Sequence, residues 1–228
     1  MNELEAIQQR HSVRAYTDKS IEGTVLAALL EEIDACNAES GLHIQLAVNE
    51  PQAFATGIFK YGFFKNVRNY LCFVGPEGPA LDEQVGFYGE RVVLKAQQLG
   101  LNTCWVALTF NRKKTLYQAD PGERLVLVAA LGYGATQGKP RKSKPVSAIV
   151  DETAGAPDWF LRGVKAALLA PTAMNQQKFR FEYLPSSAGE KPHVRATATE
   201  SGKWTGVDLG IAKYHFQVAA GSENFIWA

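Results

Sequence analysis

Alternating helix and strand patterns predict a domain of the α/β or α+β class. Three observations favour this class: long segments with helical spacing of apolar residues, short β-rich runs between them, and a globular composition. The chain has 228 residues, of which 46% are hydrophobic and 21% are charged. This composition is typical of a folded chain rather than a disordered one, and the length fits one large domain or two small, intimately packed ones.

The first part of the chain predicts an alternation of helices and strands. Helices are expected over residues 26–36 and 83–99, the second ending at Gly100, where a left-handed cap is wanted. Strands are expected over residues 42–48, 70–74, 103–108 and 125–131, and the last of these closes at Gly132-Tyr133-Gly134. A polar connection rich in proline and lysine follows over residues 135–145.

After this connection the order begins again, with a helix over 159–170, a strand over 179–184 and a helix over 207–220. The segment Gly86–Ala96 can be laid on Gly210–Ala220, and each is followed by a β-like segment that contains a tryptophan. Chance similarity between two amphipathic helices explains this match equally well. If the match is real, residues 1–150 are a first copy and residues 151–228 a shortened second copy in one compact body.

Charge and cysteine usage limit the partners that we expect. Lys and Arg total 24 and Asp and Glu total 23, so the formal charge is +1 and gives no general reason to bind nucleic acid or an acidic membrane. No apolar run approaches the roughly 20 residues of a membrane span, and residues 1–14 lack an apolar signal core. Cys36, Cys72 and Cys104 are odd in number and far apart. These features predict a cytoplasmic protein without disulfides.

Most common catalytic motifs are absent. The sequence contains no HExxH, no pair of CxxC motifs and no GxSxG. The four histidines show no metal-ligand spacing, so we expect surface or internally paired side chains and no metal. Gly132 to Gly138 has the wrong spacing for a nucleotide-binding loop, and Cys104 is expected in the core.

Three segments remain chemically suggestive, each beside a simpler interpretation. Arg10-His11-Ser12-Val13-Arg14 could bring two guanidiniums and a hydroxyl to one phosphate if it makes a helical turn; otherwise it is a solvated basic N-terminus. Lys142-Ser143-Lys144 is by itself only a charged loop. In Ala170–Gln177 a helix ends at proline and gives way to amides that can read a heteroaromatic edge; an ordinary helix-terminating turn is the alternative.

Together these segments resemble the nitroreductase family of FMN-dependent oxidoreductases. The family's R-x-S-x-R turn is matched by residues 10–14, and its A-P-[ST]-x-x-N-x-Q turn by residues 170–177. Its G-L-G-T-x-W-like segment is matched by residues 99–105, and its G-Y with a basic, proline-containing loop by residues 132–145. The resemblance covers nearly the whole chain.

The order of the motifs departs from ordinary members, in which the A-P-S turn follows the first helix after the R-x-S-x-R turn. Here residues 34–40 occupy that place. The chain resembles a divergent subgroup fused into a single-chain pseudo-dimer. This resemblance implies a three-layer α/β/α fold of the α+β class with a mainly antiparallel sheet, internally duplicated, and one FMN per chain. A monomeric pseudo-dimer and a further homodimer both remain open.

The resemblance also implies roles for individual residues. The FMN phosphate is expected at Arg10, Ser12, Arg14, Lys142 and Lys144. The isoalloxazine or ribityl group is expected beside Pro171, Thr172, Asn175 and Gln177. Backbone groups of Val106, Ala107 and Leu108 are expected near flavin N5, and Lys60 or Lys65 could add a contact.

The implied function is an FMN-dependent oxidoreductase. NAD(P)H would reduce flavin at N5, and a small acceptor such as a nitroaromatic or quinone would take the electrons in a ping-pong mechanism, with no obligatory acid–base side chain. The aromatics of residues 54–64 could line the acceptor pocket or simply form core. A flavin-binding carrier or sensor with little turnover is the main alternative, and a duplicated domain without flavin is another.

Overall fold

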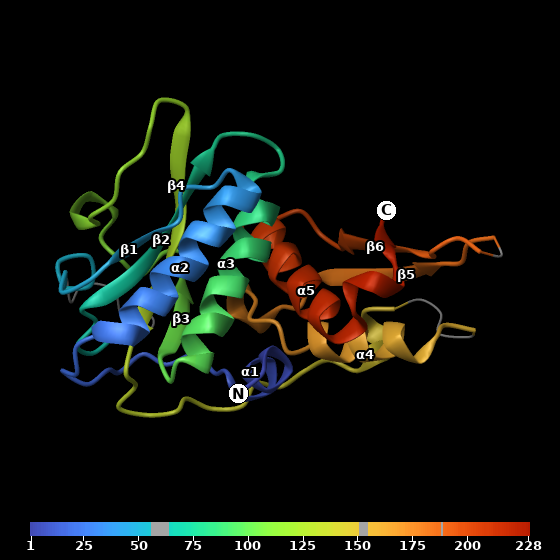
Figure 1. Ribbon diagram of the computed structural model, residues 1–228, viewed down its shortest axis with the longest axis horizontal. Helices are drawn as coiled ribbons and strands as arrows, with labels where there is room; N and C mark the ends of the chain where they lie inside the picture. The colour runs from blue at the N-terminus through green and yellow to red at the C-terminus, as the bar shows by residue number, and fades with distance from the viewer. Residues whose placement is uncertain (56–63, 151–154, 188) are drawn as a thin grey trace. The chain divides into compact units, whose positions relative to one another are not determined.

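The computed structural model describes residues 1–55, 64–150, 155–187 and 189–228 (Figure 1). The chain divides into two compact units. Unit 1 contains residues 1, 9–81 and 91–140, and unit 2 contains residues 2–8, 82–90 and 141–228. Because unit 2 takes two segments from the first half of the chain, this division follows packing rather than sequence order. The two copies over 1–150 and 151–228 stay a prediction.

Unit 1 contains a four-stranded antiparallel sheet in the order β1-β2-β4-β3. Its strands are β1 (Gln45–Ala47), β2 (Asn69–Pro76), β3 (Asn102–Val106) and β4 (Glu123–Gly132). The prediction of an α+β fold with a mainly antiparallel sheet is therefore confirmed. The strand expected over 42–48 is shorter than predicted because the Asn37 side chain binds Ile44: Oδ1 accepts from the Ile44 N–H at 2.7 Å, and Nδ2 donates to its carbonyl at 2.9 Å.

Within unit 1, the helix α2 (Gly23–Ser40) and the C-terminal part of the helix α3 (Leu81–Gln98) lie side by side across one face of this sheet (Figure 1). Arg91 on α3 joins them by ion pairs to Glu32 at 2.6 Å and Glu39 at 2.8 Å. After α3 the chain turns at Gly100, whose φ of 81° is left-handed. The predicted cap is confirmed, and glycine is suited to it because it lacks a Cβ.

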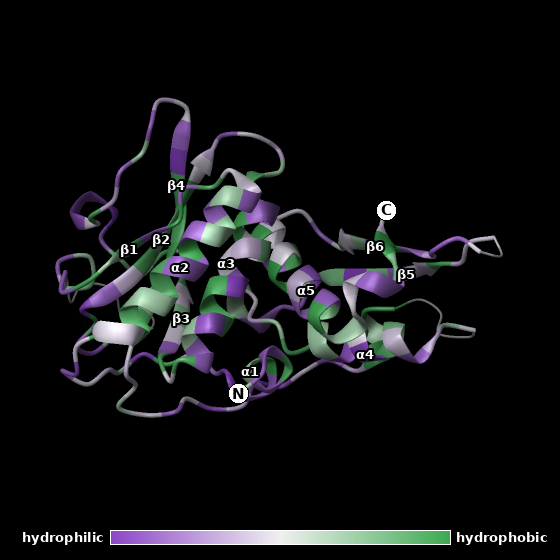
Figure 2. Ribbon diagram, viewed as in Figure 1, coloured by the Kyte–Doolittle hydropathy of each residue, from purple (hydrophilic) through white to green (hydrophobic). Residues whose placement is uncertain are grey.

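On the opposite face of the sheet, described residues from segments outside the α-helices form a core cluster. Since successive strand residues point to opposite faces, Tyr70 and Cys72 of β2 share this face with Val128 of β4. They pack against Val13 from the N-terminal segment and against Phe110 after β3. Figure 2 shows the first residues of β4 as hydrophilic and the rest as hydrophobic, as expected for a strand that enters a core covered on both faces.

In the described residues, unit 2 combines three helices and residues 82–90 of a fourth, α3, with a second sheet. The helices are α1 (Glu3–Gln9, whose last residue belongs to unit 1), α4 (Asp158–Ala167) and α5 (Thr205–Ala220). The strands β5 (Phe179–Leu184), β6 (His193–Ala198) and β7 (Ile226–Trp227) form a sheet in that order, antiparallel between β5 and β6 and parallel between β6 and β7. Aromatic rings fill its core, where Phe181 and Phe216 stack with centroids 4.8 Å apart.

Single-turn 3₁₀ segments complete the described structure at Arg112–Lys114, Val146–Ala148, Ala173–Asn175 and Ser222–Asn224. In the described part of the chain, no helix is both long and apolar enough to cross a membrane.

Two glycines allow α5 to lie directly against the part of α3 that belongs to unit 2. A Cβ at Gly86 would lie 2.1 Å from the Val207 carbonyl oxygen and 2.9 Å from the Ile211 nitrogen. A Cβ at Gly210 would lie 2.0 Å from the Glu83 carbonyl oxygen and 2.8 Å from the Phe87 nitrogen. The contact is reciprocal. On the partner helix, each glycine lies against the residue three positions before the other glycine and against the residue one position after it.

The sequence interpretation missed α1 and β6, although both carry local signals. At α1, the Asn2 side chain accepts from the Glu5 N–H at 2.8 Å and the Glu5 side chain accepts from the Asn2 N–H at 2.9 Å. This reciprocal capping box was readable as Asn-x-x-Glu. In β6 the sequence HVRATA alternates polar and apolar residues, which is the usual strand pattern.

Candidate functional site

The predicted Arg10–Arg14 segment lies along β3 in unit 1. Ser12 forms an isolated parallel bridge with Thr103, and the Val13 N–H donates to the Thr103 carbonyl at 3.0 Å. On the other side, the Arg14 carbonyl accepts from the Lys65 N–H at 2.8 Å. The two arginines were expected to converge if this segment formed a helical turn. The segment forms no such turn, because these bridges hold its backbone extended.

In an extended segment, side chains two residues apart share a face. Arg10, Ser12 and Arg14 accordingly all act on the thiol of Cys104. Burial raises the pKa of Cys104, whereas the charge of Arg14, a hydrogen bond with Ser12 and the charge of Arg10 lower it. Arg10 is buried and Arg14 is exposed, so only Arg14 presents its guanidinium to solvent. Cys104 lies in the core as predicted, at 2% exposure.

The loop after β4 packs against this segment. The His11 Nδ1 lies 3.2 Å from the Gln137 carbonyl oxygen. Gly138 follows with a left-handed φ of 74°, and a Cβ there would lie 2.7 Å from the His11 Cβ and 3.0 Å from the Ser12 carbonyl oxygen. Only glycine fits this close approach, so Gly138 fixes where the basic loop leaves the Arg10–Arg14 segment.

The backbone candidates Val106, Ala107 and Leu108 lie where β3 ends. Val106 is the last strand residue and is paired with Val128. Ala107 and Leu108 leave the sheet, and Leu108 is 67% exposed. A large apolar side chain in this position is open to a ligand.

In unit 2, hydrogen bonds join two predicted segments that lie 33 to 35 residues apart in the sequence. The Lys142 carbonyl accepts from Asn175 Nδ2 at 2.8 Å and from Gln177 Nε2 at 3.0 Å. The Lys144 N–H donates to Gln177 Oε1 at 2.9 Å, and its Nζ donates to the Gln177 carbonyl at 3.2 Å. We call this group of contacts the Lys142 clamp.

The clamp assigns different environments to the two amides. Gln177 is 2% exposed, and its side-chain oxygen and nitrogen are both bonded within the clamp. Asn175 and both lysines are exposed, while Pro171 and Thr172 are half-buried. The surface of this segment therefore presents cations and one amide, with Gln177 beneath them.

Two remaining predictions concern the segment before β2. Lys60 lies outside the described residues, as do residues 56–63 of the aromatic run. Lys65 contacts the Arg14–Tyr16 backbone through its own backbone. The rings of Phe54 and Phe64 lie edge to face with their centroids 5.1 Å apart and pack against the core. Both residues also line a cavity of about 360 Å³. The expectation that they form core is confirmed for these two rings, and a role of the cavity in binding an acceptor stays a prediction.

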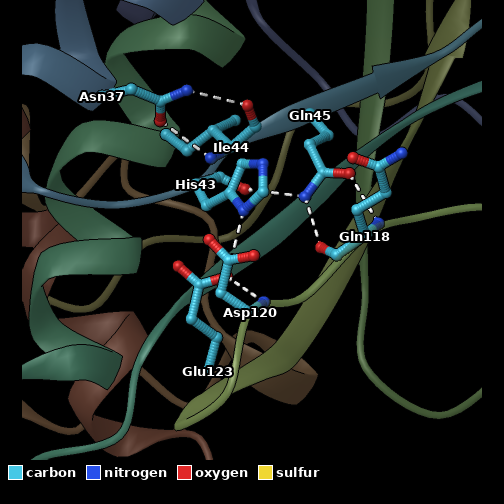
Figure 3. A network of polar contacts seen from close by, with 7 residues as sticks. All are labelled: Asn37, His43, Ile44, Gln45, Gln118, Asp120 and Glu123. Atoms are coloured by element: carbon cyan, nitrogen blue, oxygen red, sulfur yellow. Dashed lines mark hydrogen bonds and ion pairs between the residues drawn. The ribbon is translucent and has the colours of Figure 1, made fainter.

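The structure brings one histidine together with two carboxylates, which the sequence interpretation did not foresee. One imidazole nitrogen of His43 and one carboxylate oxygen from each of Asp120 and Glu123 lie within 4.8 Å of one another (Figure 3). Glu123 Oε2 lies 3.0 Å from His43 Nδ1 and accepts from the Asp120 N–H at 2.9 Å. Beside them, Gln45 and the Gln118 backbone exchange two hydrogen bonds. These contacts bind β1 to the turn before β4.

His215 is buried in unit 2 and has a partner at each ring nitrogen. Nε2 lies 2.9 Å from Glu90 Oε1, and Nδ1 lies 3.2 Å from the Ala166 carbonyl oxygen. The two contacts are satisfied either by an imidazolium that donates to a Glu90 carboxylate, or by a neutral ring that donates from Nδ1 and accepts at Nε2 from a protonated Glu90. This pair joins α3, α4 and α5 from within.

Comparisons with known proteins agree with this fold. Residues 2–220 match the family model described as "Putative TM nitroreductase". No match was found among curated proteins. A solved structure described as a "putative nitroreductase", from Thermotoga maritima MSB8, aligns with a TM-score of 0.64 and 21% identity, covering 96% of this chain and 83% of that one.

Two further solved structures are described as a "putative nitroreductase in complex with FMN". That from Desulfovibrio desulfuricans has a TM-score of 0.52 and 20% identity, and covers 65% of this chain and 94% of that one. The structure from Exiguobacterium sibiricum has a TM-score of 0.52 and 12% identity, and the alignment covers 65% of this chain and 95% of that one. At these identities the structures establish the fold, and the match of the family model over nearly the whole sequence shows that the chain belongs to this nitroreductase family.

Proposed function

We propose that this chain is an FMN-dependent oxidoreductase with one FMN site per chain. Its membership of the nitroreductase family supports an oxidoreductase. FMN is present in two of the structures that share its fold. The observation that carries the proposal is the Lys142 clamp, because it joins two of the three segments proposed for the cofactor into one surface of cations and an amide.

The donor chemistry of the described residues fits the phosphate end of FMN. Arg10, Ser12 and Arg14 lie on one face of an extended segment, and Lys142 and Lys144 are exposed on the clamp. Guanidiniums and ammoniums form charge-assisted hydrogen bonds with phosphate. We propose that these five residues bind the FMN phosphate, with Arg14 as the principal solvent-accessible guanidinium.

The remaining candidates fit the ring and ribityl end. Pro171, Thr172 and Asn175 lie at the surface of the clamp, and Leu108 is exposed at the end of β3. We propose that these residues, with the backbone of Val106 and Ala107, contact the flavin. The side-chain oxygen and nitrogen of Gln177 are both hydrogen-bonded within the clamp. We therefore propose that Gln177 holds Lys142 and Lys144 in place and does not itself bind the flavin ring.

When bound, FMN would supply the redox chemistry, namely hydride transfer from NAD(P)H to flavin N5 and reduction of a small acceptor such as a nitroaromatic or quinone. The protein's contribution is to bind the phosphate, orient the ring and stabilise negative charge on it. We propose that donor and acceptor use the same face in turn, which gives ping-pong kinetics.

Anaerobic titration of the FMN-loaded protein with NADH and with NADPH tests this function. Bleaching of the flavin absorbance within seconds, followed by recovery on adding a quinone or a nitroaromatic, is the expected result. Parallel lines in double-reciprocal plots would support the ping-pong order. Flavin that stays oxidised with both donors would refute the oxidoreductase and leave a flavin-binding carrier or sensor.

The phosphate site is tested by Arg14→Ala, with Arg195→Ala as the matched control. Arg195 is also an exposed arginine, and its guanidinium forms an ion pair with Glu182 at 2.8 Å. Loss of a charge-assisted contact with phosphate should weaken FMN binding about tenfold or more, since such bonds are worth about 1.5–3 kcal/mol. Equal FMN affinities of the two variants would remove Arg14 from the site.

A further inference from the structure

The backbone of the Pro171–Gln177 turn has an unusual conformation. Among the described residues, five that are not glycine have a left-handed φ, and three of them lie here: Met174 at 53°, Asn175 at 55° and Gln177 at 49°. Asparagine tolerates this region, whereas methionine and glutamine are disfavoured by their Cβ atoms. Strained backbone of this kind persists only where surrounding contacts hold it, and it clusters at functional sites.

Several contacts hold the turn from the side of the clamp. The Lys142 carbonyl binds the amides of Asn175 and Gln177. Thr172 Oγ1 accepts from the Gln177 N–H at 3.1 Å, which closes the turn across its own ends. These bonds fix the C-terminal part of the turn and leave its beginning, at Ala173, to another group.

Asp208 binds the beginning of the turn. It lies in the first turn of α5, is 7% exposed, and accepts from the Ala173 N–H with both oxygens, Oδ1 at 2.9 Å and Oδ2 at 3.0 Å. Burial raises the pKa of this carboxyl to about 7, against the smaller opposing effect of the Ala173 hydrogen bond. A buried carboxylate is costly, so stability alone does not account for an acid at this position.

We infer that Asp208 is a positioning residue for cofactor binding: its carboxylate fixes the Ala173 N–H and thereby sets the backbone that presents Thr172 and Asn175. This inference rests on the proposed FMN site. Asp208 acts through the turn and touches no reacting atom. The contact pairs a side chain of α5 with a backbone donor 35 residues earlier, so it lies outside the local motif that the resemblance identified.

Asp208→Ala, Asp208→Asn and the control Asp158→Ala separate positioning from simple charge removal. Asp158 also lies in the first turn of a helix of unit 2, but it is exposed. Hydrogen–deuterium exchange of the flavin-free full chain measures the turn directly. Asp208→Ala should raise exchange over residues 171–177 about tenfold, because one charge-assisted bond to the backbone is lost. Asp208→Asn, whose Oδ1 still accepts, should restore protection, and Asp158→Ala should change nothing there.

Removal of the donor provides the complementary variant. Ala173→Pro deletes the N–H that Asp208 accepts. The preceding Thr172 has φ −130° and ψ 156°, which is the conformation that a following proline favours. We expect Ala173→Pro and Asp208→Ala each to weaken FMN binding about tenfold. If they break the same contact, the double variant loses no more than either single variant.

The outcomes distinguish the inference from the proposed function. If the natural protein binds FMN but Asp208→Ala binds it equally well, the positioning role is refuted and the FMN site stands. Unchanged exchange over the turn in Asp208→Ala, or multiplicative losses in the double variant, also overturn the inference. If the natural protein binds no FMN, the proposed function fails and the positioning role fails with it. Restored FMN binding in Asp208→Asn, with a visible flavin spectrum like that of the natural protein, supports the inference.

Discussion

Replacing Gly210 with alanine should destabilise unit 2, although alanine is the better helix former. The added Cβ would lie 2.0 Å from the carbonyl oxygen of Glu83 on α3. An ordinary contact between such atoms needs at least 3.4 Å, so the two helices would have to separate by 1.4 Å (3.4 minus 2.0). A backbone carbonyl within a helix cannot rotate away, and a gap of this size forfeits much of the dispersion energy along the contact.

The magnitude follows from two opposing effects. Overpacking at a rigid contact costs about 3 kcal/mol, and the higher helix propensity of alanine returns about 1 kcal/mol. The net loss of about 2 kcal/mol corresponds to a fall in Tm of about 4–8 °C for a chain of this size. Gly86→Ala should behave in the same way, because its Cβ would lie 2.1 Å from the Val207 carbonyl oxygen.

Thermal unfolding followed by circular dichroism measures this effect. Gly78→Ala is the control, since a Cβ there meets nothing within 4 Å, and it should stay within about 0.5 kcal/mol of the natural protein. A Gly210→Ala variant as stable as the natural protein, or more stable, would show that α3 and α5 are not in backbone contact.

Three further outcomes are expected. His215→Ala removes a hydrogen-bond partner of the buried Glu90 carboxyl, so it should lower the free energy of unfolding by about 3–5 kcal/mol in urea titrations; a loss below about 1 kcal/mol would show that the contact contributes little to stability. Because the pKa of Asp208 is raised from 3.8 to about 7 in the folded state, its contribution to stability is complete below pH 4 and is lost as the pH rises through 7. The natural protein should lose up to about 4 kcal/mol over this range relative to Asp208→Asn, and parallel pH profiles would contradict the shift. Gly138→Ala should weaken FMN binding about tenfold by displacing His11 and Ser12. Gly122→Ala, with a φ of 88° and open space around its Cβ, should leave binding unchanged; titration of each variant with FMN, followed by flavin fluorescence, measures both affinities.

Much of the fold was readable because periodicity and burial agree. The apolar run at 70–74 lies within β2, where both faces are buried, and the pattern over 83–99 ends at a glycine that needs a left-handed φ. The start of β1 was not readable, because it depends on the Asn37 side chain of α2, which binds the backbone of Ile44. Such side chain to backbone competition is a tertiary effect that local patterns do not contain.

The site was readable as residue types but not as geometry. The motifs named the arginines, lysines and amides that we propose for FMN. They could not show that Gln177 is buried and bonded within the Lys142 clamp, because that depends on a loop 33 residues earlier. They also suggested a helical turn at Arg10–Arg14, whereas contacts with Thr103 and Lys65 hold this segment extended. Asp208 belongs to no recognisable sequence motif, because its partner is the backbone N–H of Ala173, which any residue other than proline would supply.

The central claim is that this chain binds one FMN, and a visible absorption spectrum tests it most directly. The purified protein is loaded with FMN, desalted, and its flavin absorbance is compared with the protein concentration. We predict one FMN per chain. A ratio near two would reveal a second site that the proposed residues do not explain. The absence of retained flavin after loading would contradict the account.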